Sequence, residues 1–182
     1  MYNLELLIHA SFSPVNEFVP RVPDGRAPGE DSKTPRICFS TKLENAISSM
    51  PGGGLALRGL LKLVPKIAPI IHVYYCLTWE NIGVRFIPPA EVQRNYHVPD
   101  AIHCGEWWAL DTPKMIHRLV KIKSADFEDG IDPNGNKGVL VKNLDYEVVK
   151  RPPANMPDTF FSRHPFKDYN LRQVLAYAGE RE

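Results

Sequence analysis

The chain has little net charge, few cysteines and no long apolar run. Its longest apolar runs fall well short of the roughly 18 residues that a membrane-spanning helix requires, so we expect no membrane span. Lys and Arg total 22 against 21 for Asp and Glu, which leaves a net charge of +1 and no long-range attraction for nucleic acid. Nucleic acid is therefore not the expected ligand, and any phosphate chemistry must be local.

The cysteines and the N-terminus both bear on the compartment. Cys38, Cys76 and Cys104 cannot all pair and lie in apolar contexts, which favours buried reduced thiols over a disulfide framework. The N-terminus has no basic segment and no small-residue cleavage site, so it lacks the pattern of a secretory signal. Together these features predict a cytoplasmic location.

The size and composition are those of one globular domain. The chain has 182 residues, of which 43 % are hydrophobic and 24 % are charged. We predict a single domain over residues 1–182, with the core at about 4–150 and a C-terminal Pro/aromatic segment and helix at 151–182. Proline supplies 17 of 182 residues, about 9 % against an average near 5 %. The fold is therefore expected to have long loops stiffened by proline.

The first forty residues predict two strands joined by a long loop. Residues 4–10 and 36–40 are short apolar runs, which are typical of buried strands. The loop at 20–35 is rich in Pro, Gly and charge, and loops of this length in compact domains are usually functional or disordered. Because Arg21, Arg26 and Arg36 lie close to both strands, we consider a role for this segment in binding an anion.

A helix follows the second strand. Thr41 and Glu44 have the spacing of a capping box, which predicts a helix over residues 43–50. The glycines at 52–54 are not followed by the Lys-Ser/Thr of a phosphate-binding loop and predict a flexible connector. Residues 55–64 then form a short helix or a turn.

The remainder of the chain is predicted to be mainly β, which makes the fold class α+β. Loops are expected at 88–91 and 97–100, and helical spacing of apolar residues recurs at 169–178. The predicted strands are 70–78, 84–87, 104–110, 115–123 and a strand pair at 138–149.

Glu106 is an acidic residue inside an otherwise apolar strand. Burying its charge without a partner would cost roughly several kcal/mol. We therefore expect the Glu106 side chain to face either solvent or a polar cleft. Strand alternation places Glu106 and Trp108 on one face and Trp107 on the other. If the strand alternates in this way, we expect an aromatic surface beside the carboxylate.

No metal site is predicted. The possible nitrogen and sulfur ligands are His97, His103, Cys104 and His117. Their spacing matches no zinc motif, and the adjacent His103 and Cys104 are expected to point to opposite faces of a strand. Residues 132–138 begin like a calcium loop, but Lys137 and Asn143 stand where Gly and Glu are required, so we predict a hairpin turn. The chain also lacks the Gly-x-Ser-x-Gly of a serine hydrolase.

Three short motifs follow one another along the chain. The first strand ends in His9-Ala10-Ser11, the second runs through Phe39-Ser40-Thr41 into a helix, and a later strand carries Glu106. In this order they resemble the ADP-ribosyltransferase superfamily, which includes rifampin-modifying ADP-ribosyltransferases and the RNA 2′-phosphotransferases. The resemblance covers about residues 4–123. The family has His-Gly-Thr or His-Gly-Ser in the first motif and a Ser-Thr-Ser-like element in the second.

The resemblance implies a split β-sheet core of the ADP-ribosyltransferase type, with few short helices, long Pro-rich loops and a cleft that receives NAD as substrate. It implies that Glu106 and His9 are catalytic, with Glu106 stabilising the oxocarbenium-like charge that develops as nicotinamide leaves. Arg36 would pair with the pyrophosphate as a bidentate fork. The nucleotide-binding residues that it implies are His9, Ser11, Arg36, Ser40 and Thr41. No metal takes part.

Two departures from the family leave alternatives open. Ala10 replaces a Gly, and no Gln-x-Glu or Glu-x-Glu pair surrounds Glu106, so the resemblance implies no particular acceptor. One alternative is a catalytically silent protein of the same fold that binds a nucleotide or a protein target, such as a phage-type anti-defence inhibitor. Another is an RNA 2′-phosphotransferase that uses Arg21, Arg26 and Arg36, although the net charge offers RNA no attraction.

Overall fold

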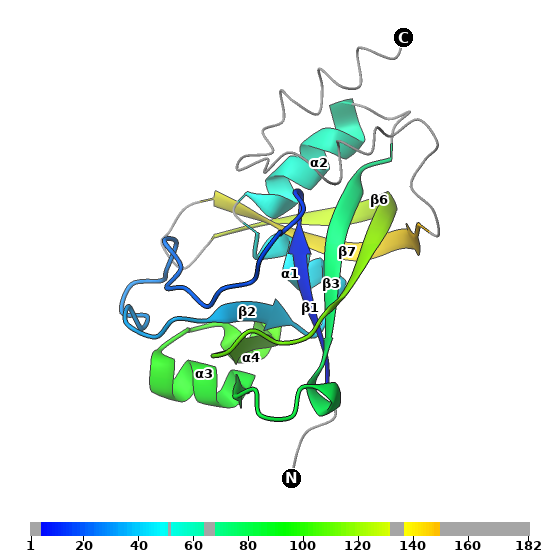
Figure 1. Cartoon of the computed structure of the whole chain (residues 1–182). Helices are drawn as coiled ribbons and strands as arrows, with labels where there is room; N and C mark the ends of the chain where they lie inside the picture. Colours follow the sequence, from blue (N-terminus) through cyan, green and yellow to red (C-terminus); the bar gives the residue numbers. More distant parts are fainter. Residues whose placement is uncertain (1–4, 51, 64–67, 132–136, 150–182) are drawn as a thin grey trace.

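The computed structural model describes residues 5–50, 52–63, 68–131 and 137–149. Within these residues, seven antiparallel strands form one sheet in the order β4-β5-β2-β1-β3-β6-β7 (Figure 1). The strands are β1 (Leu6–Ser11), β2 (Ile37–Ser40), β3 (Ile70–Leu77), β4 (Phe86–Ile87), β5 (Glu106–Ala109), β6 (Ile116–Ile131) and β7 (Lys137–Val148). The helical elements are α1 (Leu43–Ser48), α2 (Gly53–Leu63), the 3-10 turn η1 (Thr78–Glu80), α3 (Pro89–Tyr96) and α4 (Ala101–Cys104). The prediction of an α+β domain with few short helices is confirmed.

The helices pack against one face of the sheet, which we call the helix face. Helices α1 and α2 cover its β1, β3, β6 and β7 part, where Ile47 and Leu57 are fully buried against Val73. Helices α3 and α4 cover its β4 and β5 part, around the fully buried Trp108. Figure 1 shows α3 and α4 at one end of the molecule, α2 at the other end and α1 between them, beside β1.

The opposite face, which we call the loop face, is covered by connecting segments. Its core contains Leu7, Phe39 and Trp107, and the half-buried Phe18 of the segment after β1 packs against it. Because helices cover one face and loops cover the other, the central strands β1, β2 and β3 are buried on both faces. This accounts for the apolar runs from which β1, β2 and β3 were predicted.

The last strand, β7, is tied to the first two helices. The Val141 N–H donates to Ser48 Oγ (2.9 Å) at the end of α1. A Cβ at Gly54 would collide with the carbonyl of Val139, so only glycine allows α2 to approach β7 this closely. These contacts cover part of a sheet edge that would otherwise be open to other chains.

Several local predictions around the first helix are wrong. Helix α1 begins after Lys42, which makes no side-chain capping hydrogen bond, so the predicted capping box is absent. The Thr41 side chain lies instead against Gly105. Gly53 and Gly54 form the first turn of α2 rather than a connector, because this turn must pass close to β7.

The second half differs in several places. Strand β6 ends at Ile131, eight residues beyond the end predicted for the strand at 115–123. The loop predicted at 88–91 opens helix α3, since Pro at the first helical position already has helical φ and lacks only an N–H that would be unpaired there. His103 and Cys104 lie in helix α4, not on a strand. Residues 137–148 form one long strand paired with β6 rather than a strand pair. Residues 132–136 of the predicted turn and the segment predicted at 151–182 lie outside the described residues.

Candidate functional site

A line of polar side chains runs along the helix face between the two helix pairs. Arg36, Cys38 and Ser40 are alternate residues of one extended segment, and Glu106 of β5 lies directly opposite Ser40. We call these four residues the polar seam. Because β2 lies between β1 and β5, the seam separates the apolar cluster under α1 and α2 from the cluster under α3 and α4.

Glu106 is the half-buried carboxylate of the seam. The indole Nε1 of Trp108 donates to Glu106 Oε1 at 2.7 Å, which confirms that these two side chains share a face. Burial raises the pKa of Glu106, while the Trp108 hydrogen bond opposes the rise and the nearby charge of Glu30 adds to it. A partly desolvated carboxylate with one oxygen already bound is a group that can stabilise a developing positive charge.

The two cysteines beside Glu106 are poor nucleophiles. Burial, and next the charge of Glu106, raise the pKa of the Cys38 thiol far above its ordinary value. Burial raises the pKa of Cys104 to about 12. Both thiols therefore stay protonated at neutral pH, and Cys38 acts as a hydrogen-bond donor to Glu106.

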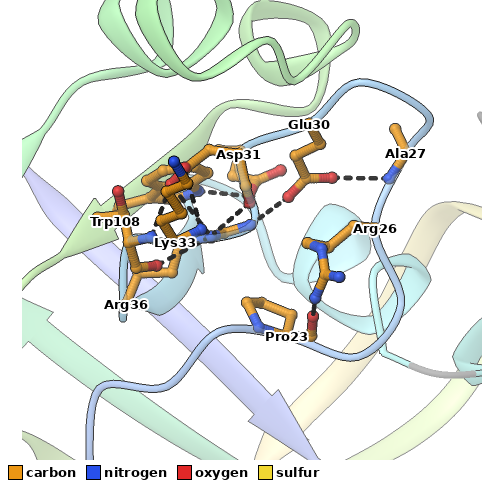
Figure 2. Close-up of polar contacts among 10 residues, drawn as sticks. Pro23, Arg26, Ala27, Glu30, Asp31, Lys33, Arg36 and Trp108 are labelled. Carbon is orange, nitrogen blue, oxygen red and sulfur yellow. Dashed lines mark hydrogen bonds and ion pairs between the residues drawn. The ribbon is translucent and has the colours of Figure 1, made fainter.

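Arg36 is held by the loop that precedes it (Figure 2). Its side chain is buried, and its guanidinium carbon lies 3.8 Å from the centroid of the Trp108 ring. It forms an ion pair with Glu30 and donates to the carbonyls of Asp31 (3.3 Å) and Thr34 (3.0 Å). The predicted long loop at 20–35 is thus folded over the seam.

The other two arginines of this loop do not join Arg36 in one site. Arg26 donates to the carbonyl of Pro23 within the loop. Arg21 forms an isolated backbone bridge with Arg36, and its own side chain is exposed. The loop therefore supplies carboxylates to the seam, and its cations lie elsewhere.

His9 lies on the other face of the sheet. Ile8 pairs with Ser40, so the helix face receives residue 8 and the loop face receives residue 9. The His9 ring packs against Phe18 and Phe39, with centroid distances of 5.1 Å and 6.1 Å. Its Nδ1 is 2.9 Å from the Cys38 carbonyl, and burial lowers its pKa. The structure does not bring His9 and Glu106 together.

The six site residues that the family resemblance implies therefore do not all lie in one place. Arg36, Ser40 and Glu106 share the polar seam. Ser11 follows His9 by two residues in β1 and lies on the loop face, opposite His72. Thr41 is exposed at the end of β2, beside Gly105.

A histidine pair on the loop face was not predicted from the sequence. His72 Nδ1 lies 3.0 Å from His117 Nε2, and the His117 ring stacks on Tyr74 at 4.7 Å. The alternation of residues 72 and 74 was a usable signal for a shared face. The sequence could not show that His117 joins these two residues, because its position depends on the register between β3 and β6, in which Tyr74 pairs with His117.

Because His72 is buried beside His117, we expect the free energy of unfolding to fall in mild acid. Burial, and next the charge of His117, lower the pKa of His72 from 6.5 to about 4. The unfolded state therefore binds more protons between these values, so stability is complete above pH 6.5 and is lost as the pH falls toward 4. The loss is expected to reach roughly 3 kcal/mol, at about 1.4 kcal/mol per pKa unit.

Urea unfolding at pH 7, 5.5 and 4.5 measures this effect, with His72→Gln as the comparison. The variant keeps a neutral hydrogen-bonding side chain but cannot titrate, so its free energy of unfolding should fall less steeply than that of the wild type. Equal slopes for the two proteins would contradict the assignment to His72.

Within the described residues, no group of three His, Cys, Asp or Glu side chains is placed to hold a metal ion. In the same part of the chain, no helix is long and apolar enough to cross a membrane. Comparison with protein families, with curated proteins and with solved structures found no match to this chain.

Proposed function

We propose that the chain is an ADP-ribosyltransferase-like protein that binds NAD or a related ADP-ribose nucleotide at the polar seam and cleaves or transfers its ADP-ribose. The observation that carries the proposal is the pairing of Ser40 with Glu106 on neighbouring strands and on the same face. These residues come from two motifs that are more than sixty positions apart in the sequence. The first motif lies on β1, the next strand of the sheet.

The sheet also supports the split core that this fold requires. In the described part of the chain, β1 and β2 pair only at Ile8 and Ser40, whereas β1 and β3 pair along all of β1. Between its β4-β5-β2 part and its β1-β3-β6-β7 part, the sheet is therefore joined by a short ladder of one residue pair, which we call a narrow junction. This narrow junction is the feature of the sheet that supports a split core.

The chemistry proposed for Glu106 is electrostatic. The bond between the ribose C1′ and the nicotinamide nitrogen breaks, and nicotinamide leaves with the electron pair. A positive charge develops on the ribose, and water or an acceptor nucleophile then attacks C1′. The Glu106 carboxylate, with one oxygen held by Trp108, would accept a hydrogen bond from the ribose 2′-hydroxyl and stabilise that charge.

Two observations favour a second candidate, a catalytically silent protein of the same fold that binds a nucleotide or a protein target, as a phage-type inhibitor would. His9 lies across the sheet from Glu106, and the guanidinium of Arg36 is paired with Glu30 rather than free for a pyrophosphate. Both candidates use the same seam. They differ in whether Glu106 is needed for a reaction.

Calorimetric titration with NAD and with ADP-ribose, together with a nicotinamide-release assay, separates the two candidates. We expect wild-type protein to bind both nucleotides and release nicotinamide. Glu106→Gln should retain binding but lower the release rate by about 10²-fold or more, because one transition-state contact is lost. The exposed Glu80→Gln, with the same loss of charge, should behave as wild type.

The other outcomes assign the protein differently. Nucleotide binding without release, unchanged in Glu106→Gln, would establish the silent binding protein. Absence of binding to either nucleotide would overturn the nucleotide proposal and leave a protein target as the partner to identify.

A further inference from the structure

On the edge of the Arg36 guanidinium formed by Nε and Nη2, only one of the two nitrogens makes a hydrogen bond within the described residues. The Nε–H and one Nη2–H of an arginine project from the same edge and form a fork that fits two oxygens of one oxyanion. In Arg36, Nη2 donates to Glu30 Oε1. Nε is buried and makes no hydrogen bond within the described residues, although the Cys38 thiol lies close to the guanidinium.

Glu30 cannot fill the fork alone. Its second oxygen, Oε2, accepts a hydrogen bond from the Ala27 N–H at 2.8 Å, so it is turned away from Arg36. Nη1 of Arg36 donates to the Asp31 and Thr34 carbonyls. Asp31 lies 3.9 Å from Nη1, on the other edge of the guanidinium. A buried donor that is left open is costly, and a second oxygen beside Nε would satisfy it.

Glu30 is carried by a small separate turn. Its N–H donates to the Ala27 carbonyl at 3.0 Å, and Gly29 supplies the positive φ of 83° that the turn requires. Pro28 and Gly29 are exposed. The loop is fixed to the body of the protein one residue later, where the Asp31 N–H donates to the Tyr96 carbonyl at 3.0 Å. The backbone hydrogen bond of the 27–30 turn is thus internal to the turn, and the bond to the body of the protein lies at Asp31.

From this geometry we infer that Glu30 is an internal occupant of an oxyanion site on Arg36, and that residues 27–30 are a lid that a phosphate-bearing ligand displaces. A phosphate or pyrophosphate would supply two oxygens, one to Nη2 in place of Glu30 and one to the open Nε. The charge of Arg36 stays compensated throughout the exchange. The inference rests on the proposed function only for the natural ligand, which would be the pyrophosphate of an ADP-ribose nucleotide.

Inorganic pyrophosphate is the direct probe, because it tests the fork without any glycosidic reaction. We expect Glu30→Gln to bind pyrophosphate at least tenfold more tightly than the wild type in calorimetry, since the competing charge is gone. Asp24→Asn is the matched control: it removes the same charge from an exposed position in the same loop and should change the affinity less than twofold. Equal or weaker binding by folded Glu30→Gln would show that the ion pair is only structural.

A second measurement uses the wild-type protein, in case Glu30→Gln does not fold. The NMR resonance of the Arg36 Nε–H should shift on addition of pyrophosphate and should be missing in Arg36→Lys. A resonance that stays in place while pyrophosphate binds would overturn the inference. If pyrophosphate binds more tightly to Glu30→Gln but no nicotinamide is released from NAD, the lid is supported and the transferase is rejected. If nicotinamide is released but Glu30→Gln binds pyrophosphate no more tightly than the wild type, the transferase is supported and the lid is rejected.

Discussion

Replacing Trp108 by Ala is expected to lower the free energy of unfolding by about 3–5 kcal/mol, the range for truncating a buried aromatic side chain. Trp108 is fully buried, and Tyr96 of α3 packs on it at a ring distance of 4.8 Å. Its indole also carries the cation of Arg36 on its face and holds Glu106 through its N–H. The substitution therefore removes a packing centre and loosens two charged residues at the same time.

Denaturant unfolding of Trp108→Ala, Trp108→Phe and Trp79→Ala measures this effect. Trp108→Phe keeps most of the ring volume and should cost less, with the loss of the Glu106 hydrogen bond as its main defect. Trp79 is 43 % exposed, so Trp79→Ala should change stability by less than about 1 kcal/mol. A Trp108→Ala variant as stable as Trp79→Ala would show that helices α3 and α4 are not held through this residue.

Replacing Arg36 by Met is expected to cost about 3–5 kcal/mol, because it removes the contacts of Arg36 with Trp108 and two carbonyls and, while the 27–30 turn stays closed, leaves the Glu30 carboxylate without its cation at 10 % exposure. The loss comes mainly from the remaining charge rather than from the missing ion pair. The double variant Arg36→Met/Glu30→Gln should therefore recover a large part of the stability.

A double-mutant cycle of urea unfolding checks this expectation, with the two single variants, the double variant and the wild type. Arg85→Met, at an exposed position, is the control for loss of an arginine and should stay within about 0.5 kcal/mol of the wild type. If the double variant is as unstable as Arg36→Met alone, the guanidinium acts through its contacts with Trp108 and the backbone carbonyls instead of through Glu30.

Strands that depend on a local apolar pattern could be predicted from the sequence. β1, β2 and β3 appear within two residues of their expected ends, because each is a short buried run bounded by polar or turn residues. Helix α3 was missed, since its two prolines indicate a loop unless the second of them takes the first helical position.

The candidate site could be predicted only where one strand defines it. Alternation within β5 was sufficient to place Glu106 beside Trp108. The relation between His9 and Glu106 depends on register across β1, β2 and β5, where a shift by one residue reverses the face. The attachment of Arg36 to Glu30 depends on a loop that has no periodic pattern. These two features decide what the seam can bind, and neither is encoded locally.

The contacts of β7 with α1 and α2 have a consequence for how the chain acquires its structure. The Val141 N–H and its acceptor on Ser48 are 93 residues apart in the sequence. Helices α1 and α2 thus cannot complete their packing until nearly all of the sheet has been synthesised. Such non-local closure slows folding toward the millisecond-to-second range. On the ribosome, the apolar faces of both helices would stay open in the meantime, which leaves this segment prone to aggregation until β7 is in place.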